Sequence, residues 1–575
     1  MTTPAAPRVP LPGSVTARGG LLALLLLAAC VPADSRGGPD AADGEIPEAE
    51  RYGGTAVVLL AQDFQPLNPL TADLRPNLQL HQFVLYTPVL RYDRQFRPLP
   101  GLAEQWDTVR VAPDTLQLTF RLRRDVRWHD GAPTTADDVL FTFVRTKEPK
   151  TASPHAAMLR LYSPVAEKLD SFTVRFRVRA SPDFLSFWMT RPPAPKHLLQ
   201  AVPPEAMRQH PFGAERVVGN GPFRFVRRVS GQEWIFEANP LHPPALGGRP
   251  YLDRLVFRVV PDGTGRLTDV LTGAADVSAI PPARRAEVAG APELRLHDFP
   301  EGEWSYIGWN LRLPLFRDTR VRQALALGLD RKAIAHAVAG GPAEPGGSTV
   351  TPAHWAYDAD DPTLTLPHDP ARAGRLLGEA GWYDRDGDGI RENTAGQPFR
   401  FVLKFPSGYE QSREAAVVSQ AQLRRIGVDV VVREVELKTL IQQLEGRIDA
   451  RGERIRDYQA VILGWVDGPF SKDDSPYLHS RSSMNETGFS NPRADSLMDS
   501  LRVTLDRAAA LPLWREYQRL LAREQPYTVL YYPESLWSVR ERLQDVEMDG
   551  RGFLATVPRW WIPPAQRRTS RRSAS

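Results

Sequence analysis

The stretch Trp128-His129-Asp130-Gly131-Ala132-Pro133-Thr134-Thr135-Ala136-Asp137-Asp138-Val139 is the most specific local pattern in this sequence. Gly131 follows an aromatic segment and permits a tight turn, because glycine adopts backbone angles that other residues avoid. Thr135 and Asp138 have the spacing of a capping box, in which a hydroxyl and an acid satisfy free backbone amides at a helix start. The stretch therefore predicts a strand end, a tight turn and a helix over residues 135–145.

Strand and helix patterns alternate outward from this stretch along the chain. Short apolar or alternating runs that are typical of strands occupy residues 55–60 (TAVVLL), 115–122 (TLQLTFRL) and 172–178 (FTVRFRV). Further helices are predicted at residues 321–338, 370–380 and 412–426, the last ending at Gly427 before another strand. This mixed order predicts an α/β architecture of several lobes.

Length and composition bound the class of protein. A chain of 575 residues is several times a typical domain of roughly 100–200 residues, so more than one structural unit is expected. Hydrophobic residues make up 42% and charged residues 24%, which excludes a disordered or fibrous chain. The 72 basic and 68 acidic residues give a net charge of +4, too even for a dedicated nucleic-acid binder. Apolar runs stay short of the about 20 residues that span a bilayer.

The chain contains a single cysteine, Cys30, so no intrachain disulfide is possible. It follows a basic segment and the apolar run LLALLLLAA, the pattern of an export signal. The tetrad Leu27-Ala28-Ala29-Cys30 resembles a bacterial lipobox, which implies cleavage before Cys30 and lipid attachment to its sulfur. A cleaved signal with a chance cysteine is the alternative. We predict a signal peptide at residues 1–29 and a lipidated cysteine with a flexible tether at 30–50.

Motifs spread over most of the chain resemble a known family. They lie at residues 101–106 (GLAEQW), 118–123 (LTFRLR), 128–139, 195–198 (PKHL), 219–225 (GNGPFRF), 310 (Asn), 316–325 (FRDTRVRQAL), 329–334 (LDRKAI), 380–382 (AGW), 423–428 (LRRIGV) and 464–465 (GW). In this order they resemble family 5 of the bacterial extracellular solute-binding proteins, the oligopeptide- and dipeptide-binding receptors of ABC importers. The resemblance extends from about Gly53 to about Tyr532.

The resemblance implies an α/β, two-lobed fold of the periplasmic-binding-protein type (class II, three-domain peptide-receptor type), with mixed sheets and a ligand cleft between the lobes. It implies a discontinuous lobe I at residues 51–92, 210–303 and 525–565, an inserted domain II at 93–209 and a lobe III at 304–524. The basic segment 566–575 (QRRTSRRSAS) is expected to be a disordered tail.

The function implied is capture of peptides by hinge closure of two lobes and delivery to an ABC permease and its ATPase. The protein is expected to be a monomer, exported to the periplasmic or cell-surface face of the membrane and lipid-anchored at Cys30. No cofactor, no catalytic residue and no nucleic-acid partner are expected. A non-peptide solute, such as an oligosaccharide, an opine-like conjugate or a metal complex, is the alternative ligand for the same fold.

The resemblance also implies a carboxylate for the amine end of a ligand, shortly after Gly464-Trp465. Asp467 is the second residue after Trp465, whereas familiar peptide receptors place the acid at the third, which is Gly468 here. Asp467 is therefore either the amine anchor or a turn residue before Gly468-Pro469. Trp465 either offers a flat face to the ligand or packs in the core.

The loop before residue 412 is a candidate site for an anion. Helix starts present free N–H groups, so a ligand carboxylate could lie there with Tyr409 or Arg413 assisting. A simple capped turn is the alternative. Asn310 follows a predicted strand and either faces the cleft or packs at the strand end.

Patterns for catalysis and metal binding are weak. His129-Asp130 has no supporting nucleophile motif, since G-x-S-x-G is absent, and no pair of histidines has the spacing of a zinc site. Residues 384–389 (DRDGDG) imitate the start of a calcium loop, but Ala395 stands where a bidentate glutamate is expected. A polar turn is the alternative, and we predict neither an enzyme nor a metal site.

Overall fold

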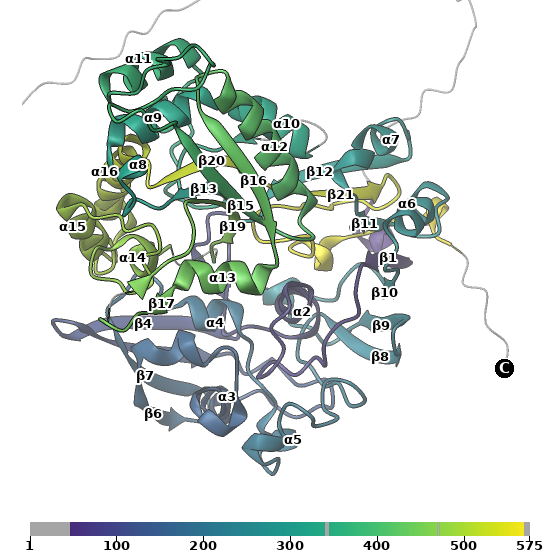
Figure 1. Cartoon of the computed structure of the whole chain (residues 1–575). Helices are drawn as coiled ribbons and strands as arrows, with labels where there is room; N and C mark the ends of the chain where they lie inside the picture. The colour runs from purple at the N-terminus through teal and green to yellow at the C-terminus, as the bar shows by residue number, and fades with distance from the viewer. Residues whose placement is uncertain (1–45, 340–343, 453, 469, 471, 569–575) are drawn as a thin grey trace, which may run out of the picture. The chain divides into compact units, whose positions relative to one another are not determined.

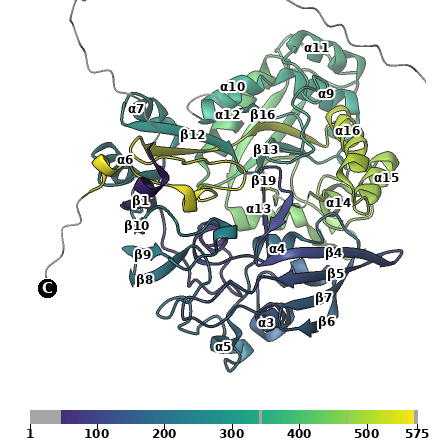
Figure 2. The same cartoon turned by 180° about the vertical axis from the view of Figure 1, so that it is seen from behind.

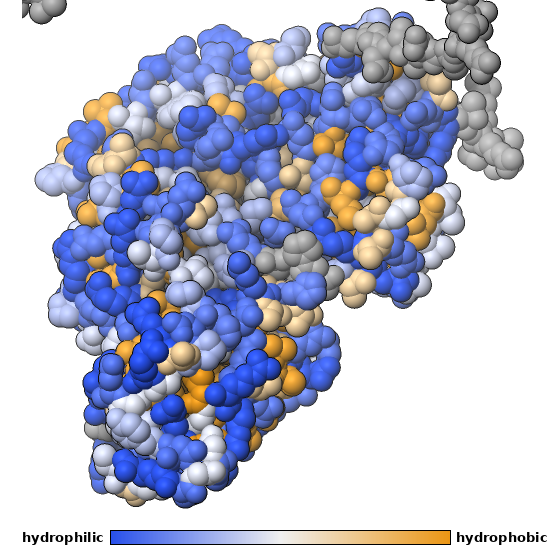
Figure 3. All heavy atoms as spheres, turned by 90° about the horizontal axis from the view of Figure 1, so that it is seen from above, coloured by the Kyte–Doolittle hydropathy of each residue, from blue (hydrophilic) through white to orange (hydrophobic). Residues whose placement is uncertain are grey.

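The structure is a computed structural model that describes residues 46–339, 344–452, 454–468, 470 and 472–568. The predicted signal peptide, Cys30 and the tether up to residue 45 lie outside the described residues. The end of the predicted tether forms part of a short helix, α1 (Glu48–Arg51). In the part of the chain that the structure describes, no helix is long and apolar enough to cross a membrane. On the face drawn in Figure 3, hydrophilic side chains predominate and apolar ones gather in small groups.

The first sheet joins three separate stretches of the chain (Figure 1, Figure 2). Over the described residues it has seven strands in the order β12-β21-β11-β1-β10-β9-β8. They are β1 (Thr55–Leu60), β8 (Phe223–Val229), β9 (Glu233–Ala238), β10 (Arg254–Val259), β11 (Val277–Ala279), β12 (Leu294–Pro300) and β21 (Glu534–Arg540). β1 pairs in parallel with β10 and β11 and is buried from Ala56 onward, as its continuous apolar run predicts. Helices α6 (Gly263–Leu271) and α7 (Arg285–Ala289) pack beside this sheet.

The second sheet is antiparallel and comes from one stretch of the chain. Its four strands among the described residues follow the order β4-β5-β7-β6: β4 (Ala103–Ala112), β5 (Thr115–Leu122), β6 (Tyr162–Asp170) and β7 (Thr173–Arg179). Helix α3 (Ala136–Lys147) packs on β6 and β7. It begins with the predicted capping box, in which Thr135 N donates to Asp138 Oδ2 at 2.9 Å. An aromatic core, with Phe120, Phe143, Phe176 and Trp188, joins helix and sheet.

The third sheet positions the functional site. As far as the chain is described, it has six strands in the order β14-β20-β13-β19-β15-β16: β13 (Glu303–Trp309), β14 (Glu344–Pro345), β15 (Arg400–Pro406), β16 (Asp429–Val435), β19 (Ala460–Val466) and β20 (Tyr527–Tyr532). Alternate side chains of β13 enter two different cores, with Ile307 and Trp309 on one face and Trp304 and Tyr306 on the other.

Helices cover both faces of the third sheet. The Ile307 face packs on α9 (Thr319–Gly328), α10 (Arg331–Ala339), α11 (Pro370–Glu379) and α12 (Glu410–Arg424). The Trp304 face packs on α13 (Leu437–Glu445), α15 (Pro492–Leu501) and α16 (Arg507–Glu524). A sheet with a core on each face must be apolar on both, which explains the nearly continuous apolar sequence AVILGWV of β19.

Two predicted boundaries differ from the structure. The single helix expected at 321–338 is two helices, because Leu329 is extended and the Asp330 side chain accepts from Ala333 N at 3.0 Å, starting α10. The predicted return to lobe I at residue 525 precedes β20, but β20 pairs with β13 in the third sheet, and only β21 lies in the first. The run YTVLYY of β20 is largely apolar or aromatic and buried throughout, so its pattern does not specify which sheet it joins.

The described part of the C-terminal segment packs on the body of the protein. Residues 569–575 of the predicted disordered tail lie outside the described residues. Arg567 Nε donates to Ile562 O at 3.0 Å, and Arg568 Nη2 lies 3.7 Å from the buried Asp276 carboxylate. Residues 567 and 568, which the prediction assigned to the disordered tail, therefore pack on the body.

Two sequence motifs meet at the junction between the first and second sheets. His129 N donates to Gly219 O at 2.7 Å, and Gly219 N donates to His129 Nδ1 at 3.2 Å. Burial lowers the pKa of His129 to about 4, so the ring is neutral at pH 7 and can accept this bond. The Asn220 side chain adds two bonds, with Oδ1 accepting from Thr87 N at 2.8 Å and Nδ2 donating to Thr134 Oγ1 at 3.2 Å. His129 is thus engaged in structure through its backbone and ring.

Glycine is required at this junction by close approach of two backbones. The amides of Asn220 and Gly221 both donate to Leu85 O, at 3.1 and 2.9 Å. A Cβ atom on Gly219 would lie 2.0 Å from Leu85 O, and one on Gly221 would lie 2.6 Å from Leu85 C. Any side chain here must push the two segments apart.

Gly219→Ala is expected to lower the free energy of unfolding by about 3 kcal/mol, because overpacked sites cost this much. The midpoint of urea unfolding, followed by tryptophan fluorescence, measures the loss. Gly263→Ala is the control, since a Cβ at this helix start meets only ordinary contacts of 3.6 Å or more. Equal midpoints for the two variants would contradict the steric account of the junction.

Candidate functional site

A cavity of about 760 Å³ opens beside the ends of β13 and β19. Its walls carry five aromatic side chains, Tyr306, Tyr409, Trp465, Tyr477 and Tyr531. The start of α12 and one side of α13 complete the wall, through Gln411, Ser412 and Ile441. Concave, partly aromatic sites of this size are typical of small-ligand binding.

Charged groups of both signs lie in the same cavity. Glu303 and Glu486 contribute carboxylates, and Arg454 and Arg456 contribute guanidinium groups. Burial raises the pKa of Glu486 and of Glu303, so each carboxylate is held in a setting that disfavours its charge. Burial likewise lowers the pKa of Arg456. An occupant with separated positive and negative groups would relieve these costs of burial.

The structure brings two predicted site residues, Trp465 and Tyr409, into this cavity. The Trp465 ring lies edge-on to the Tyr477 ring, with centroids 4.2 Å apart. Tyr409 precedes α12 and is 52% exposed. Gln411 and Ser412 of the first helical turn also line the cavity, so the predicted anion-accepting helix start faces it.

Arg413 and Asn310 are placed elsewhere. The Arg413 guanidinium pairs with Glu410 of the same helix turn, with Nε donating to Glu410 Oε2 at 2.9 Å. Asn310 is buried at the end of β13, where Nδ2 donates to Tyr458 O at 2.9 Å and Oδ1 accepts from Arg312 N at 3.3 Å. Neither residue lines the cavity, and a role in ligand binding remains a prediction for both.

The Asp467 carboxylate is paired inside the protein. Asp467 Oδ2 accepts from Lys472 Nζ at 2.8 Å and from Trp304 Nε1 at 3.1 Å. Lys472 also pairs with Asp474 Oδ1 at 2.8 Å, and its side chain is only 1% exposed. Burial opposes the charge on Lys472, but the Asp474 and Asp467 carboxylates raise its pKa. Trp465 and Val466 line the cavity, whereas the Asp467 side chain turns away from it toward this lysine.

A second, larger cavity of about 900 Å³ lies between the second sheet and helices of the third. Arginines from both sides line it, with Arg110, Arg160 and Arg179 facing Arg502 and Arg507. It contains none of the predicted ligand residues. Phe470 closes its edge by packing on Tyr92 and Phe96, with ring centroids 4.7 and 5.4 Å away.

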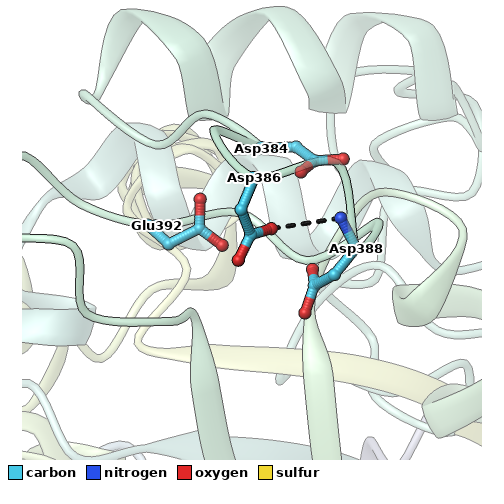
Figure 4. Close-up of side chains that lie close together, drawn as sticks. All are labelled: Asp384, Asp386, Asp388 and Glu392. Atoms are coloured by element: carbon cyan, nitrogen blue, oxygen red, sulfur yellow. Dashed lines mark hydrogen bonds between the residues drawn. The ribbon is translucent and has the colours of Figure 1, made fainter.

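The acidic loop at residues 384–392 gathers four carboxylates whose oxygens lie within 4.8 Å of one another (Figure 4). Asp384, Asp386 and Asp388 are exposed, and each accepts backbone amides of its own loop, as Asp386 does from Asp388 N at 3.1 Å. The buried Glu392 accepts from Arg385 N at 2.8 Å. These oxygens could ligate a calcium ion, but the same bonds also complete a polar turn without one.

Sequence reasoning missed the charged residues of the cavity. Arg454, Arg456 and Glu486 lie in irregular or two-residue segments without a distinctive pattern. Only folding brings them beside Trp465. A half-buried glutamate between tyrosines has no local signature, because the tyrosines come from β13 and β20, far apart in the sequence.

With this fold and cavity, the chain belongs to the bacterial extracellular solute-binding proteins, family 5, whose family model (family 5 Middle) matches residues 97–487. It is 28% identical to the oligopeptide-binding protein AppA of Bacillus subtilis (strain 168) over 484 residues, which are 83% of this chain and 86% of AppA. It is 29% identical over 490 residues to di/tripeptide-binding protein 4 of Pseudomonas aeruginosa (strain UCBPP-PA14), covering 77% of this chain and 84% of that protein.

Solved structures agree with this assignment. Bacillus subtilis AppA in complex with a nonapeptide has a TM-score of 0.66 at 27% identity, covering 89% of this chain and 99% of that one. The predicted family and the two-lobed α/β fold are confirmed.

Lys472→Met is expected to lower the free energy of unfolding by about 3–5 kcal/mol, because Asp467 and Asp474 would remain buried without their cation. Urea unfolding monitored by circular dichroism measures the change. Lys438→Met, at the exposed start of α13, is the matched control and should match the wild type. If both variants unfold at the wild-type midpoint, the lysine does not hold this segment together.

Proposed function

We propose that this chain binds peptides in the cavity beside β19 and delivers them to the permease of an ABC importer. The main support for this proposal is the cavity, because it combines aromatic walls with carboxylates and guanidinium groups that suit the charged ends of a peptide. Membership in family 5 and the likeness to oligopeptide-binding AppA support the same ligand class.

The edge of β19 supplies a backbone argument for peptides. β19 pairs with β13 over its whole length, but with β15 only at Ala460 and Val461. Its last residues, 462–466, therefore have no strand partner on the β15 side within the described residues. An extended peptide can add to such an edge through main-chain hydrogen bonds, which do not depend on its sequence. Gly464 and Trp465 at this edge line the cavity.

We further propose that Trp465 and Tyr409 contact the bound peptide, and that the lobes close on it by a hinge motion. Export and lipid anchoring at Cys30 complete the proposal, with support from the sequence Leu27-Ala28-Ala29-Cys30. An anchored receptor would hold captured peptide close to the membrane that contains the permease and its ATPase.

Native mass spectrometry of residues 31–575, purified without denaturation, tests the ligand class. Released ligands are expected to be peptides of varied sequence, because main-chain recognition tolerates different side chains. A sugar or a metal complex in their place would replace peptides as the ligand while leaving the fold assignment intact.

Tyr409→Ala is expected to weaken peptide binding about tenfold, since an aromatic contact in a binding site contributes more than about 1 kcal/mol. Isothermal titration calorimetry with a peptide recovered from the protein measures the change. Tyr383→Ala is the matched control, because Tyr383 is 51% exposed, similar to Tyr409, and does not line the cavity. Equal affinities for both variants would remove Tyr409 from the binding site.

Cys30→Ser is expected to release the protein from membranes into the soluble fraction, because one lipid-modified cysteine would be the point of attachment. Cell fractionation followed by immunoblotting measures the distribution. Membrane association that survives the substitution and resists high salt would contradict lipidation at Cys30.

A further inference from the structure

Asp467, which the sequence offers as one candidate for the ligand amine, already has a cation. Lys472 Nζ lies 2.8 Å from Asp467 Oδ2 and 2.8 Å from Asp474 Oδ1, so a lysine of the chain fills the place of an incoming ammonium. The same nitrogen lies 5.2 Å from the centre of the Trp304 ring, a cation–π contact. A ligand amine could reach Asp467 only by displacing a buried, doubly paired lysine, which is costly.

A different carboxylate, that of Glu486, is available in the cavity. Glu486 Oε1 accepts long hydrogen bonds from Tyr527 Oη at 3.2 Å and from Tyr306 Oη at 3.4 Å. Within the part of the chain that the structure describes, this carboxylate forms no ion pair. Burial raises the pKa of Glu486. Arg456 is close enough to oppose this shift, but its Nε and Nη2 donate to Leu444 O and Ser483 O. A half-buried carboxylate with only two neutral donors has capacity for a cation.

The backbone at Glu486 is held firmly in place. Its carbonyl oxygen accepts from Tyr458 Oη at 2.9 Å and from Arg312 Nη1 at 2.6 Å. Tyr306 and Tyr527 are themselves buried, and their ring centroids lie 4.6 Å apart. The carboxylate is therefore preorganised, so that binding a cation would require little further ordering.

Aromatic rings surround the space next to this carboxylate. A void of about 10 Å³ is lined by Glu486 and Asp474, by Leu478, and by the aromatic residues Trp304, Tyr306, Trp465, Tyr477 and Tyr527. This is the space of about one water molecule, which an ammonium group matches in size. Aromatic faces beside a carboxylate attract cations through the ring quadrupole as well as through charge. Glu486, Tyr306, Trp465 and Tyr477 also line the larger cavity, so a ligand there could reach this space.

We propose that Glu486, and not Asp467, receives the primary ammonium of the ligand, with the surrounding aromatic rings enclosing it. This inference rests on the proposed function, because it treats the cavity as the peptide site. It makes Glu486 the residue that distinguishes ligands with a free amine from those in which the amine is blocked. Lys472 has a positioning role, since it neutralises the neighbouring carboxylate and directs the ligand amine to Glu486.

The test is a competition between two ligand pools on the full-length folded protein. A random-sequence pool from dipeptides to nonapeptides, lacking lysine, is mixed with an equal amount of the same pool acetylated at the α-amine. Bound species are counted by native mass spectrometry. The wild type is expected to prefer the free-amine pool at least tenfold, and Glu486→Gln should reduce this preference to about one. Asp467→Asn should keep it.

Two readouts separate loss of the ammonium site from loss of folding. Glu486→Gln should bind the acetylated pool as well as the wild type does, because that pool does not use the carboxylate. Glu434→Gln, an exposed glutamate outside the cavity, is the matched control and should behave as the wild type.

Two outcomes would overturn the assignment to Glu486 while leaving peptide binding in place. In the first, Glu486→Gln keeps the preference for the free-amine pool. In the second, Asp467→Asn loses that preference but still binds the acetylated pool. A folded wild-type protein that binds neither pool would instead overturn the proposed function, and the proposed ammonium site at Glu486 would fall with it.

Discussion

The pairing of β13 with strands on both of its sides determines where the functional groups lie. On one side Trp304 lies opposite Trp465 of β19, and Tyr306 lies opposite Leu463. On the other side β20 brings Tyr527 against Gly308, so that Tyr306 and Tyr527 can both donate to Glu486. A shift of register by one residue would move these side chains to the opposite face of the sheet, into the core packed by α9 to α12. The cavity depends on this register.

Charge burial is the second constraint on the site. Lys472, Asp467 and Asp474 form a compact cluster in which each charge has a partner within 2.8 Å. Thr349 and Tyr517 also donate to Asp474, at 2.8 and 2.9 Å, which completes its hydrogen bonding. The Glu486 carboxylate lies in the same aromatic region, but it accepts only two hydrogen bonds, both from tyrosine hydroxyls, among the described residues. The paired cluster around Lys472 therefore has a structural role, whereas the incompletely paired Glu486 carboxylate is the group suited to bind a ligand.

Much of the fold followed from local patterns, because those patterns are set by short-range physics. The capping box at Thr135 and Asp138, the buried strand at residues 55–60 and the helix at 370–380 are observed nearly as predicted. The long helix expected at 321–338 was wrong, since its apolar periodicity continues across an extended residue, Leu329, and a new helix start at Asp330. The predicted boundary at 525 separates β20 from the strand with which it pairs, because an apolar strand does not encode which of two sheets it joins.

The sequence by itself determined the family, the mixed α/β character and two residues of the cavity, Trp465 and Tyr409, because motifs and periodicity are properties of neighbouring residues. Only the tertiary structure decided the partners of the charges. The sequence leaves Asp467 as either an amine anchor or a turn residue, but folding places the buried Lys472 against it. Glu486 has no pattern in the sequence, but folding sets it among tyrosines from distant strands without an ion pair among the described residues. Electrostatic pairing depends on distance in space, and distance along the chain does not reveal it.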